Sequence, residues 1–295
     1  MFDLRYHVAS LAAVFLALII GILVGVGLSD RGLFDTAKKS LLEQRVANLQ
    51  TRLDEASQRS SDAAREREAA KTFVNEAYPV LIRNRLHGKQ IAVVFVGSAG
   101  GGVRSAVDRA LTDAGAQQLR LRALKVPVEQ QQLDSALASV PDAREYTGRS
   151  HLESLGKALG QELVLGGDTP LWSTLTDALV EERAGGSKQP ADGVVVVRTA
   201  APQRDGTSRF LLGLYEGLEG AGVPAVGVET TDTSNSAVAV YRAGGLSSVD
   251  DVDTPTGRLA LVLLLAGAPS GQYGLRPSAH QGSLPPIRKT VGAGG

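Results

Sequence analysis

The segment that first suggests chemistry is the Gly-rich stretch at residues 97–102, which reads Gly-Ser-Ala-Gly-Gly-Gly and follows the apolar run 91–96. Backbone amides at the start of a helix attract anions, so a turn of this kind can bind phosphate. The stretch matches neither the G-x-G-x-x-G pattern nor a phosphate-binding loop with its lysine. We therefore favour a vestigial Rossmann-like turn over a nucleotide site.

A second candidate is the acidic cluster of Asp250, Asp251 and Asp253, which precedes an apolar stretch at residues 259–266. Three carboxylates can hold a hard cation such as Mg²⁺. Carboxylates before a helix also cap its amides or stabilise a turn without any ion. Capping is the interpretation that we favour.

The remaining reactive residues form no recognisable constellation. The four histidines are His7, His87, His151 and His280, and no two of them share an i,i+4 or i,i+2 spacing. Cysteine is absent and Met1 is the one methionine, so ligands for soft metals are scarce. No G-x-S-x-G elbow is present. The sequence predicts no enzymatic activity, no catalytic residues and no evident cofactor.

Charge and aromatic content argue against nucleic-acid binding. Lys and Arg total 31, Asp and Glu also total 31, and aromatic residues make up 4% of the chain. A chain with no net charge has no global field for a polyanion, and few aromatic rings leave few platforms for base stacking. We expect no nucleic-acid partner.

The N-terminal segment is the clearest element that the sequence predicts. Residues 8–28 carry no charge, and at 1.5 Å per residue such a helix is about 32 Å long, which matches a bilayer core. A cleaved signal peptide is the alternative, but its apolar region is shorter and is followed by a small-residue cleavage site. We predict a retained, single-pass anchor over residues 1–34, with the lipid bilayer as its partner.

One face of this predicted helix carries only small residues. Ala13, Ala17, Gly21 and Gly25 recur every four positions. A ridge of small residues lets two helix backbones approach closely within lipid. Alanine and glycine are also common in any bilayer helix, yet the spacing favours a homo-oligomer.

Residues 35–87 turn polar and predict a helical stalk. Apolar residues follow a heptad pattern that includes Val46, Leu49 and Leu53, which indicates a left-handed coiled coil. A single solvated helix with many i,i+4 ion pairs is the alternative. Pro79 is expected to kink or interrupt the helix, and Gly88 to end it.

Residues 88–275 predict an α/β domain with a Rossmann-like, mainly parallel sheet. Apolar runs at 91–96, 119–126, 193–197 and 225–228 are typical of buried strands, and helical patterns lie between them. Residues 238–241 are predicted to add a short strand. The stretch 259–266 is too short to cross a bilayer and predicts a buried helix capped by Asp253 or Thr254.

Two further segments complete the predicted organisation. Residues 130–183 are mostly helical and polar, with Trp172 as their one large anchor, and are expected to form a helical insertion. Residues 276–295 are rich in Gly and Pro and are expected to be a disordered tail.

Three stretches resemble one family of proteins. They are residues 5–25, which begin Arg-Tyr-His-Val-Ala-Ser-Leu-Ala-Ala-Val-Phe-Leu-Ala-Leu, residues 248–262, which read Ser-Val-Asp-Asp-Val-Asp-Thr-Pro-Thr-Gly-Arg-Leu-Ala-Leu-Val, and the Gly-Gln-Tyr-Gly of residues 271–274. Together they resemble the MctB family of actinobacterial envelope proteins, which are similar to a mycobacterial copper transport protein. The resemblance implies copper transport or efflux in the cell envelope, with copper as the transported ion. It supplies no copper ligands.

Two functions remain open at this stage. The first is copper handling, in which several copies form a channel because one helix encloses no pore. The second is a non-transporting oligomeric scaffold that binds a second envelope membrane protein, a role to which the resemblance also points through kinship with proteins of cell separation. An enzyme that acts on a phosphorylated ligand at residues 97–102 is a weaker third hypothesis. The positive-inside rule places the domain on the cytoplasmic side, whereas the resemblance implies the opposite side.

Overall fold

The computed structural model describes residues 4–29, 33–186 and 188–287. The chain divides into two compact units, residues 1–70 and residues 71–295. The four-part division that the sequence suggests, with boundaries at residues 34, 87 and 275, remains a prediction.

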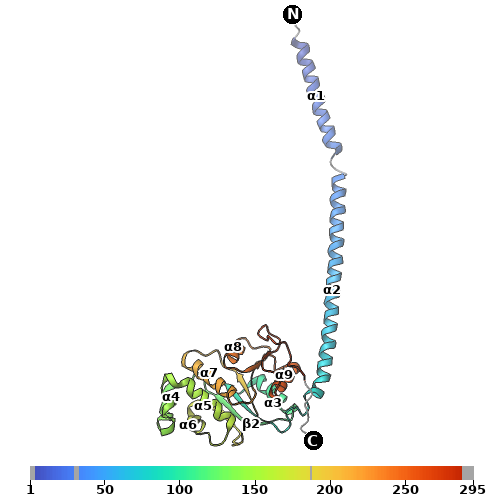
Figure 1. The fold of residues 1–295 in the computed structure, drawn as a ribbon. Coiled ribbons are helices and arrows are strands. Elements are labelled where there is room, and N and C mark those ends of the chain that lie inside the picture. Colours follow the sequence, from blue (N-terminus) through green and yellow to red (C-terminus); the bar gives the residue numbers. More distant parts are fainter. Residues whose placement is uncertain (1–3, 30–32, 187, 288–295) are drawn as a thin grey trace. The chain divides into compact units, whose positions relative to one another are not determined.

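The first unit consists of helices (Figure 1). Helix α1 spans Leu4–Ser29, and within it His7–Gly27 is long and apolar enough to cross a membrane. Helix α2 spans Leu33–Ile82, so its last turns belong to the second unit. The predicted helices at the anchor and in the stalk are therefore present. Pairing of α2 into a coiled coil stays a prediction.

The end of α2 differs from the sequence prediction. The sequence predicts that Pro79 kinks or interrupts the helix; the helix continues through Pro79, so it is not interrupted there. It ends at Ile82 rather than near Gly88, and Asn84 then takes a left-handed conformation with φ 58°. Proline removes one backbone hydrogen bond near the end of the helix, and asparagine tolerates the left-handed region. Burial of Ile82 and Leu86 fixes the turn.

The second unit contains a seven-stranded sheet in the order β3-β2-β1-β4-β5-β6-β7. The strands are β1 Gln90–Val96, β2 Gln117–Leu124, β3 Val180–Ala184, β4 Gly193–Arg198, β5 Ala225–Val228, β6 Ser247–Val249 and β7 Gln272–Tyr273. All neighbours pair in parallel except β2 and β3, which are antiparallel. The mainly parallel sheet is therefore confirmed. Strands β3, β6 and β7 were not foreseen.

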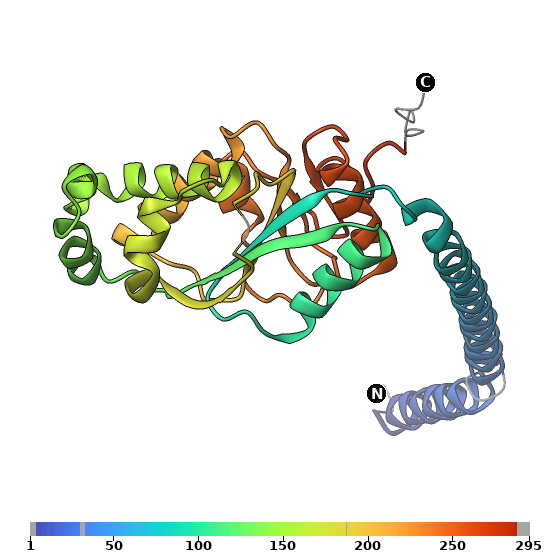
Figure 2. The ribbon, with the colours of Figure 1, turned by 90° about the horizontal axis from the view of Figure 1, so that it is seen from below.

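Helices cover both faces of the sheet (Figure 2). One face packs on α3 (Gly101–Asp113), α9 (Pro255–Leu265) and the end of α2. The other face packs on α4 (Gln130–Ala138), α5 (Leu152–Leu165), α6 (Pro170–Leu179), α7 (Asp205–Glu219) and α8 (Val238–Ala243), with two 3-10 turns at Pro141–Tyr146 and Arg149–His151. Val93 and Val94 point to opposite faces and join different core clusters. This alternation explains the continuous apolar runs, because both faces are buried.

The predicted strand at residues 238–241 is wrong, because these residues form α8. Val238 and Tyr241 are buried whereas Val240 is exposed, and this three-residue spacing belongs to a helix. The hydroxyl of Tyr241 accepts a hydrogen bond from the backbone N–H of Arg198 at 3.0 Å. That contact ties α8 to the end of β4.

The buried helix before the C-terminal segment is confirmed as α9. The side chain of Thr254 accepts a hydrogen bond from the backbone N–H of Gly257 at 2.9 Å, so Thr254 is its N-cap. Pro255 occupies the first turn, where its missing N–H costs nothing. Of the two caps that the sequence suggested, Asp253 is not the one used.

Helices α5 and α7 pack at close range through four glycines. A Cβ added to Gly156 would lie 2.1 Å from the carbonyl oxygen of Phe210, and one added to Gly213 would lie 2.0 Å from that of Glu153. Gly160 and Gly217 make equivalent contacts one turn later. Only glycine allows two helix backbones to approach this closely, so these positions fix the geometry of the helical layer.

The predicted disordered tail lies only partly within the described residues, since residues 288–295 fall outside them. In the described part, the guanidinium of Arg276 donates hydrogen bonds to the carbonyl oxygens of Thr230, Thr231 and Thr233. Residues 276–287 contain neither helix nor strand.

Candidate functional site

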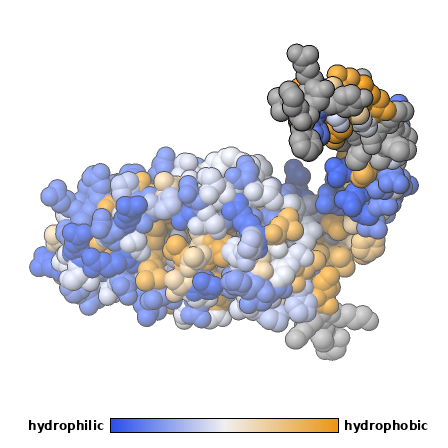
Figure 3. Space-filling view, turned by 90° about the horizontal axis from the view of Figure 1, so that it is seen from above, coloured by the Kyte–Doolittle hydropathy of each residue, from blue (hydrophilic) through white to orange (hydrophobic). Residues whose placement is uncertain are grey.

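The small-residue ridge of α1 lies on its surface, as predicted for a helix that meets another helix. Ala13, Ala17, Gly21 and Gly25 are all exposed. A Cβ added to Gly21 or Gly25 would meet no atom within 4 Å. The exposed side chains beside them, such as Val14, Leu18 and Ile22, are apolar. Figure 3 shows one face of the α/β domain, on which hydrophilic side chains predominate. The ridge is thus available to a second helix in lipid, and its role in association remains a prediction.

The apolar seam of α2 is also at the surface. Val46, Leu49 and Leu53 are 52%, 64% and 70% exposed, so this single chain leaves them uncovered. Ion pairs also lie on this helix, such as that of Glu55 with Arg59 at 2.8 Å. Exposed pairs of this kind contribute little to stability. The seam therefore fits the predicted coiled coil, although the ion pairs also fit a solvated helix.

The Gly-rich turn lies where β1 and β4 diverge, at the carboxyl edge of the sheet. Gly97 has φ +101°, and a Cβ there would lie 2.8 Å from Oγ1 of Thr199 and 2.9 Å from the backbone nitrogen of Ala200. The strand order reverses direction at β1, since β2 lies on one side of it and β4 on the other. Ligands of open α/β sheets bind at the carboxyl edge where such a reversal occurs. A pocket of about 580 Å³ opens beside the turn. Its charged lining residues are Lys125, Glu129 and Glu181, a set that matches no phosphate site.

The acidic cluster is occupied by hydrogen bonds from the protein. The carboxylate of Asp250 accepts the backbone N–H groups of Leu275 at 2.8 Å and Arg276 at 3.2 Å. Asp253 accepts both the N–H and the hydroxyl of Thr231, at 2.8 and 2.6 Å. These bonds favour the turn interpretation over a cation site. Within the described ranges, no group of three or more His, Cys, Asp or Glu side chains is arranged to hold a metal ion.

Asp251 differs from its neighbours because its side chain is fully buried. Its carboxylate accepts one hydrogen bond, from Oγ1 of Thr254 at 2.9 Å. Burial, and then repulsion from Asp250 and Asp253, raise the pKa of Asp251 to about 6. The cluster thus contains a group that titrates near neutral pH, which the spacing of the three residues did not reveal.

The four histidines lie on separate elements and are all exposed. They occupy α1, the turn after α2, the second 3-10 turn and the segment after β7. The Nε2 atom of His280 lies 3.4 Å from Nη1 of Arg242. One copy of the chain therefore does not assemble them into a metal centre.

A polar cluster anchors the end of α2 to the α/β domain, and the sequence analysis missed it. The hydroxyl of Tyr78 donates to Asp113 at 2.8 Å and accepts from Nε of Arg258 at 3.2 Å. The guanidinium of Arg258 also lies over the Tyr78 ring, 5.1 Å from its centroid. Burial, and then the bond to Asp113, raise the pKa of Tyr78 to about 12. The signal was Arg258, a lone charge in the otherwise apolar α9.

Comparison with known proteins decides the family. A family described as "Copper transport outer membrane protein, MctB" matches residues 1–284. The chain belongs to the MctB family. The copper transporters MctB of Mycobacterium tuberculosis and Mycobacterium bovis are each 27% identical to it over 93% of this chain and 96% of their own length. The copper transporter MctB of Mycobacterium leprae is 26% identical over 97% of this chain and 100% of its own length.

Membership of the MctB family covers both structural units, because the match runs from the anchor helix to the segment beyond β7. None of these relatives is named as an enzyme. The relatives are named as copper transporters, the description of the family adds an outer membrane, and α1 fits a membrane anchor. The resemblance noted in the sequence is thus confirmed at the level of the family.

Proposed function

We propose that this protein is a single-pass, membrane-anchored protein of the cell envelope that acts in copper homeostasis. Family membership over residues 1–284 is the observation that carries the proposal. The one apolar helix of sufficient length within the described residues, His7–Gly27, supports the anchor.

Copper movement by this chain requires more than one copy. A single helix encloses no pore, and backbone groups within lipid must be satisfied inside the helix itself. The ridge at Ala13, Ala17, Gly21 and Gly25 and the seam on α2 offer two faces for self-association along neighbouring stretches of chain. We infer that the copies associate through α1 and through a coiled coil of α2, and that copper is the cargo.

The alternative is a non-transporting scaffold with the same oligomeric build. It is favoured by the exposed histidines and by the hydrogen bonds that occupy the acidic cluster, since neither offers a copper site in one chain. In this case the oligomer would present the α/β domain to a second membrane protein of the envelope. The two hypotheses share the association surface and differ in their effect on copper.

Gene deletion with complementation separates them. Loss of the gene should raise cell-associated copper, and the parent chain should restore it. A chain with Gly21→Leu and Gly25→Leu should fail to restore it, because two leucines on the ridge keep the helices apart. The matched control is Gly27→Leu, which adds the same side chain off the ridge at a position with equally open space.

Each result has a defined reading. Unchanged copper content and tolerance in the deletion strain would refute the copper hypothesis and leave the scaffold. Crosslinking in membranes should trap a defined oligomer of the parent and of Gly27→Leu, and only monomer of the double variant. A monomeric parent chain would refute self-association under both hypotheses.

A further inference from the structure

The two most exposed large apolar side chains among the described residues lie near the end of α2. Val80 is 76% exposed and Phe73 is 71% exposed, more than any large apolar side chain described in the anchor helix α1. Both belong to the part of α2 that lies within the second structural unit. A single exposed apolar side chain is ordinary, whereas several on one face form a surface for a partner.

Phe73 and Val80 lie on the same face of the helix with Ala77 between them. The three residues are spaced by four and then three positions, which places them one above another on a helix. Lys71 and Glu76, the nearby charged residues, fall outside this spacing. We call Phe73, Ala77 and Val80 the apolar stripe.

The α/β domain packs on a different side of the same turns. Tyr78 and Ile82 are buried, and Leu81 packs against the same core cluster. These three residues are centred roughly 120° around the helix from the apolar stripe, at 100° per residue. The hydroxyl of Tyr78 also bonds to Asp113 and Arg258, which fixes the rotation of the helix on the domain. The fold therefore leaves the apolar stripe uncovered.

The heptad pattern of α2 enters these turns with one row open and the other closed. One row recurs every seven residues and consists of Leu49, Ala56, Ala63, Ala70 and Ala77. The other row contains Leu53 and reaches Leu81 after four heptads, where the chain's own domain covers it. A helix that follows the first row as far as Ala77 therefore meets Phe73 and Val80 in place of Leu81.

We propose that the apolar stripe is a contact between two copies of this chain, with their α2 helices parallel and in register. The inference rests on the self-association proposed above and extends it from the stalk to the α/β domain. A twofold axis brings the same patch to both sides of a contact, so Phe73 of one copy meets Phe73 of the other. Ala77 lets the helices approach closely while the larger side chains fill the seam.

Two features favour a second copy over a different partner. The anchors of two copies lie in one bilayer, so their α2 helices start at the same level and run in the same direction. The apolar stripe offers neither charge nor a hydrogen-bonding side chain, and an identical stripe matches it in length and character. Because the stripe belongs to the second unit, this contact would hold two α/β domains in one assembly.

Single cysteines test the contact directly, because the chain contains no cysteine of its own. The full-length chain with Val80→Cys, oxidised with diamide in membranes, should form a disulfide-linked dimer. A disulfide requires Cα atoms about 4.4–6.8 Å apart, so it reports a close contact. Asn75→Cys is the matched control, since Asn75 is exposed on the same turns but points away from the apolar stripe. Leu49→Cys reports separately on the seam of the stalk.

Two further tests address register and chemistry. A mixture of Phe73→Cys and Val80→Cys chains should link to each other less than Val80→Cys links to itself, because the two positions are about 10 Å apart along the helix. In the Val80→Cys chain, Phe73→Glu should lower the yield of dimer about fivefold or more, since it places two carboxylates face to face. Asn75→Glu adds the same charge to another face and should leave the yield unchanged.

The outcomes separate this inference from the proposed self-association. Dimers of Leu49→Cys without dimers of Val80→Cys would overturn the contact at the apolar stripe and leave the stalk seam intact. No dimer of either would overturn both. A disulfide between Val80→Cys and a protein of different mass, or an equal yield from Asn75→Cys, would overturn the pairing of two copies at the apolar stripe. Stronger links in the mixture than in Val80→Cys alone would overturn the parallel register.

Discussion

Replacing Gly213 by alanine tests the close packing of α5 and α7. The added Cβ would lie 2.0 Å from the carbonyl oxygen of Glu153 and 2.7 Å from its carbonyl carbon. Both are backbone atoms, so no side chain can rotate away. Helix α5 must therefore shift by about 1 Å or more to restore an ordinary contact, and the shift would disturb the core around Leu155 and Leu159.

The expected magnitude follows from two opposing effects. Alanine in place of glycine stabilises a helix interior by about 1 kcal/mol. Overpacking against a backbone costs about 1–3 kcal/mol and sometimes more, and this site lies at the upper end because neither contact can yield. We expect Gly213→Ala to lower the free energy of unfolding by about 2 kcal/mol. Gly102→Ala, in the first turn of α3 and with open space around its Cβ, should be neutral or stabilising.

Urea unfolding of the full-length protein in micelles, followed by the emission of Trp172, measures the effect. Trp172 is buried in the same helical layer, so its emission reports on that layer. With a slope of about 2 kcal/mol per molar urea, the midpoint of Gly213→Ala should fall by about 1 M. A midpoint equal to that of Gly102→Ala would refute the close approach of the two helices.

Three further changes have defined outcomes. Asp251 binds its proton more tightly in the folded state than in the unfolded chain, so the neutral carboxyl group stabilises the fold. This stabilisation is complete below pH 4 and is lost as the pH rises through the pKa of about 6. The free energy of unfolding of the parent should therefore fall by about 1.4 kcal/mol between pH 5 and 8, and Asp251→Asn should abolish that slope in urea midpoints. Tyr78→Phe removes the hydrogen bond to Asp113 but keeps the ring, and should cost about 1–2 kcal/mol by the same assay, whereas no loss would show that the bond is dispensable. Leu49→Glu with Leu53→Glu places charges on the stalk seam and should abolish crosslinked oligomers in membranes, and their persistence would exclude the seam.

Much of the α/β domain could be predicted because its local signals agree. The valine runs in β1 and β4 are buried on both faces, so composition alone indicates central parallel strands. Thr254 and Pro255 predict the start of α9, because a capping threonine and a proline in the first turn both indicate that a helix begins there. Where several local signals predict the same element, tertiary contacts do not change the secondary structure that the segment adopts.

Other features depend on contacts between distant segments. The four residues Val-Ala-Val-Tyr at 238–241 suit a strand by composition, and only the burial of Tyr241 against Gly227 selects a helix. Strand β7 is two residues long and has no periodicity to read. The glycines of α5 and α7 show a four-residue spacing, but sequence alone does not say that the two helices face each other.

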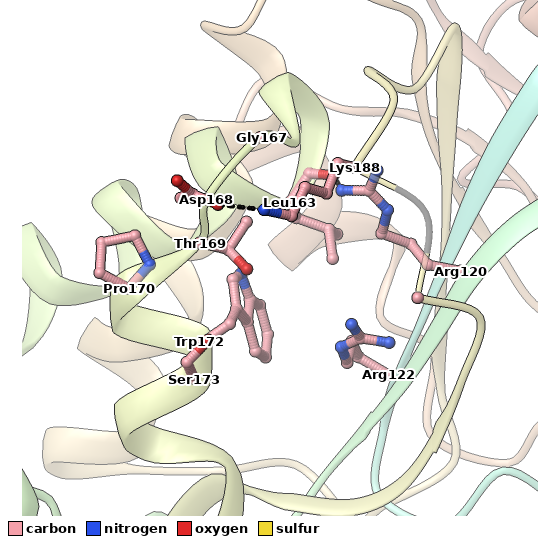
Figure 4. A pocket seen from close by; sticks show the side chains of 11 residues that line it. Arg120, Arg122, Leu163, Gly167, Asp168, Thr169, Pro170, Trp172, Ser173 and Lys188 are labelled. Carbon is pink, nitrogen blue, oxygen red and sulfur yellow. Dashed lines mark hydrogen bonds and ion pairs between the residues drawn. The ribbon is translucent and has the colours of Figure 1, made fainter.

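The polar residues of strand β2 show the same limit. Alternation of Arg120, Leu121 and Arg122 predicts a strand with one polar face, which by itself indicates solvent. Helices α5 and α6 cover that face instead, so Arg120 is buried. The burial of Arg120 thus follows from α5 and α6, which come later in the chain (Figure 4).

Cell-associated copper tests the central claim most directly, namely that a tethered protein of this family controls copper in the envelope. The measurement is elemental mass spectrometry of washed cells that lack the gene, with and without complementation by the full chain or by residues 35–295. We predict raised copper in the deletion strain, restoration by the full chain, and no restoration by the chain without its anchor. Equal copper in all four strains, parent included, would contradict the proposed role, and restoration by residues 35–295 would contradict the need for the anchor.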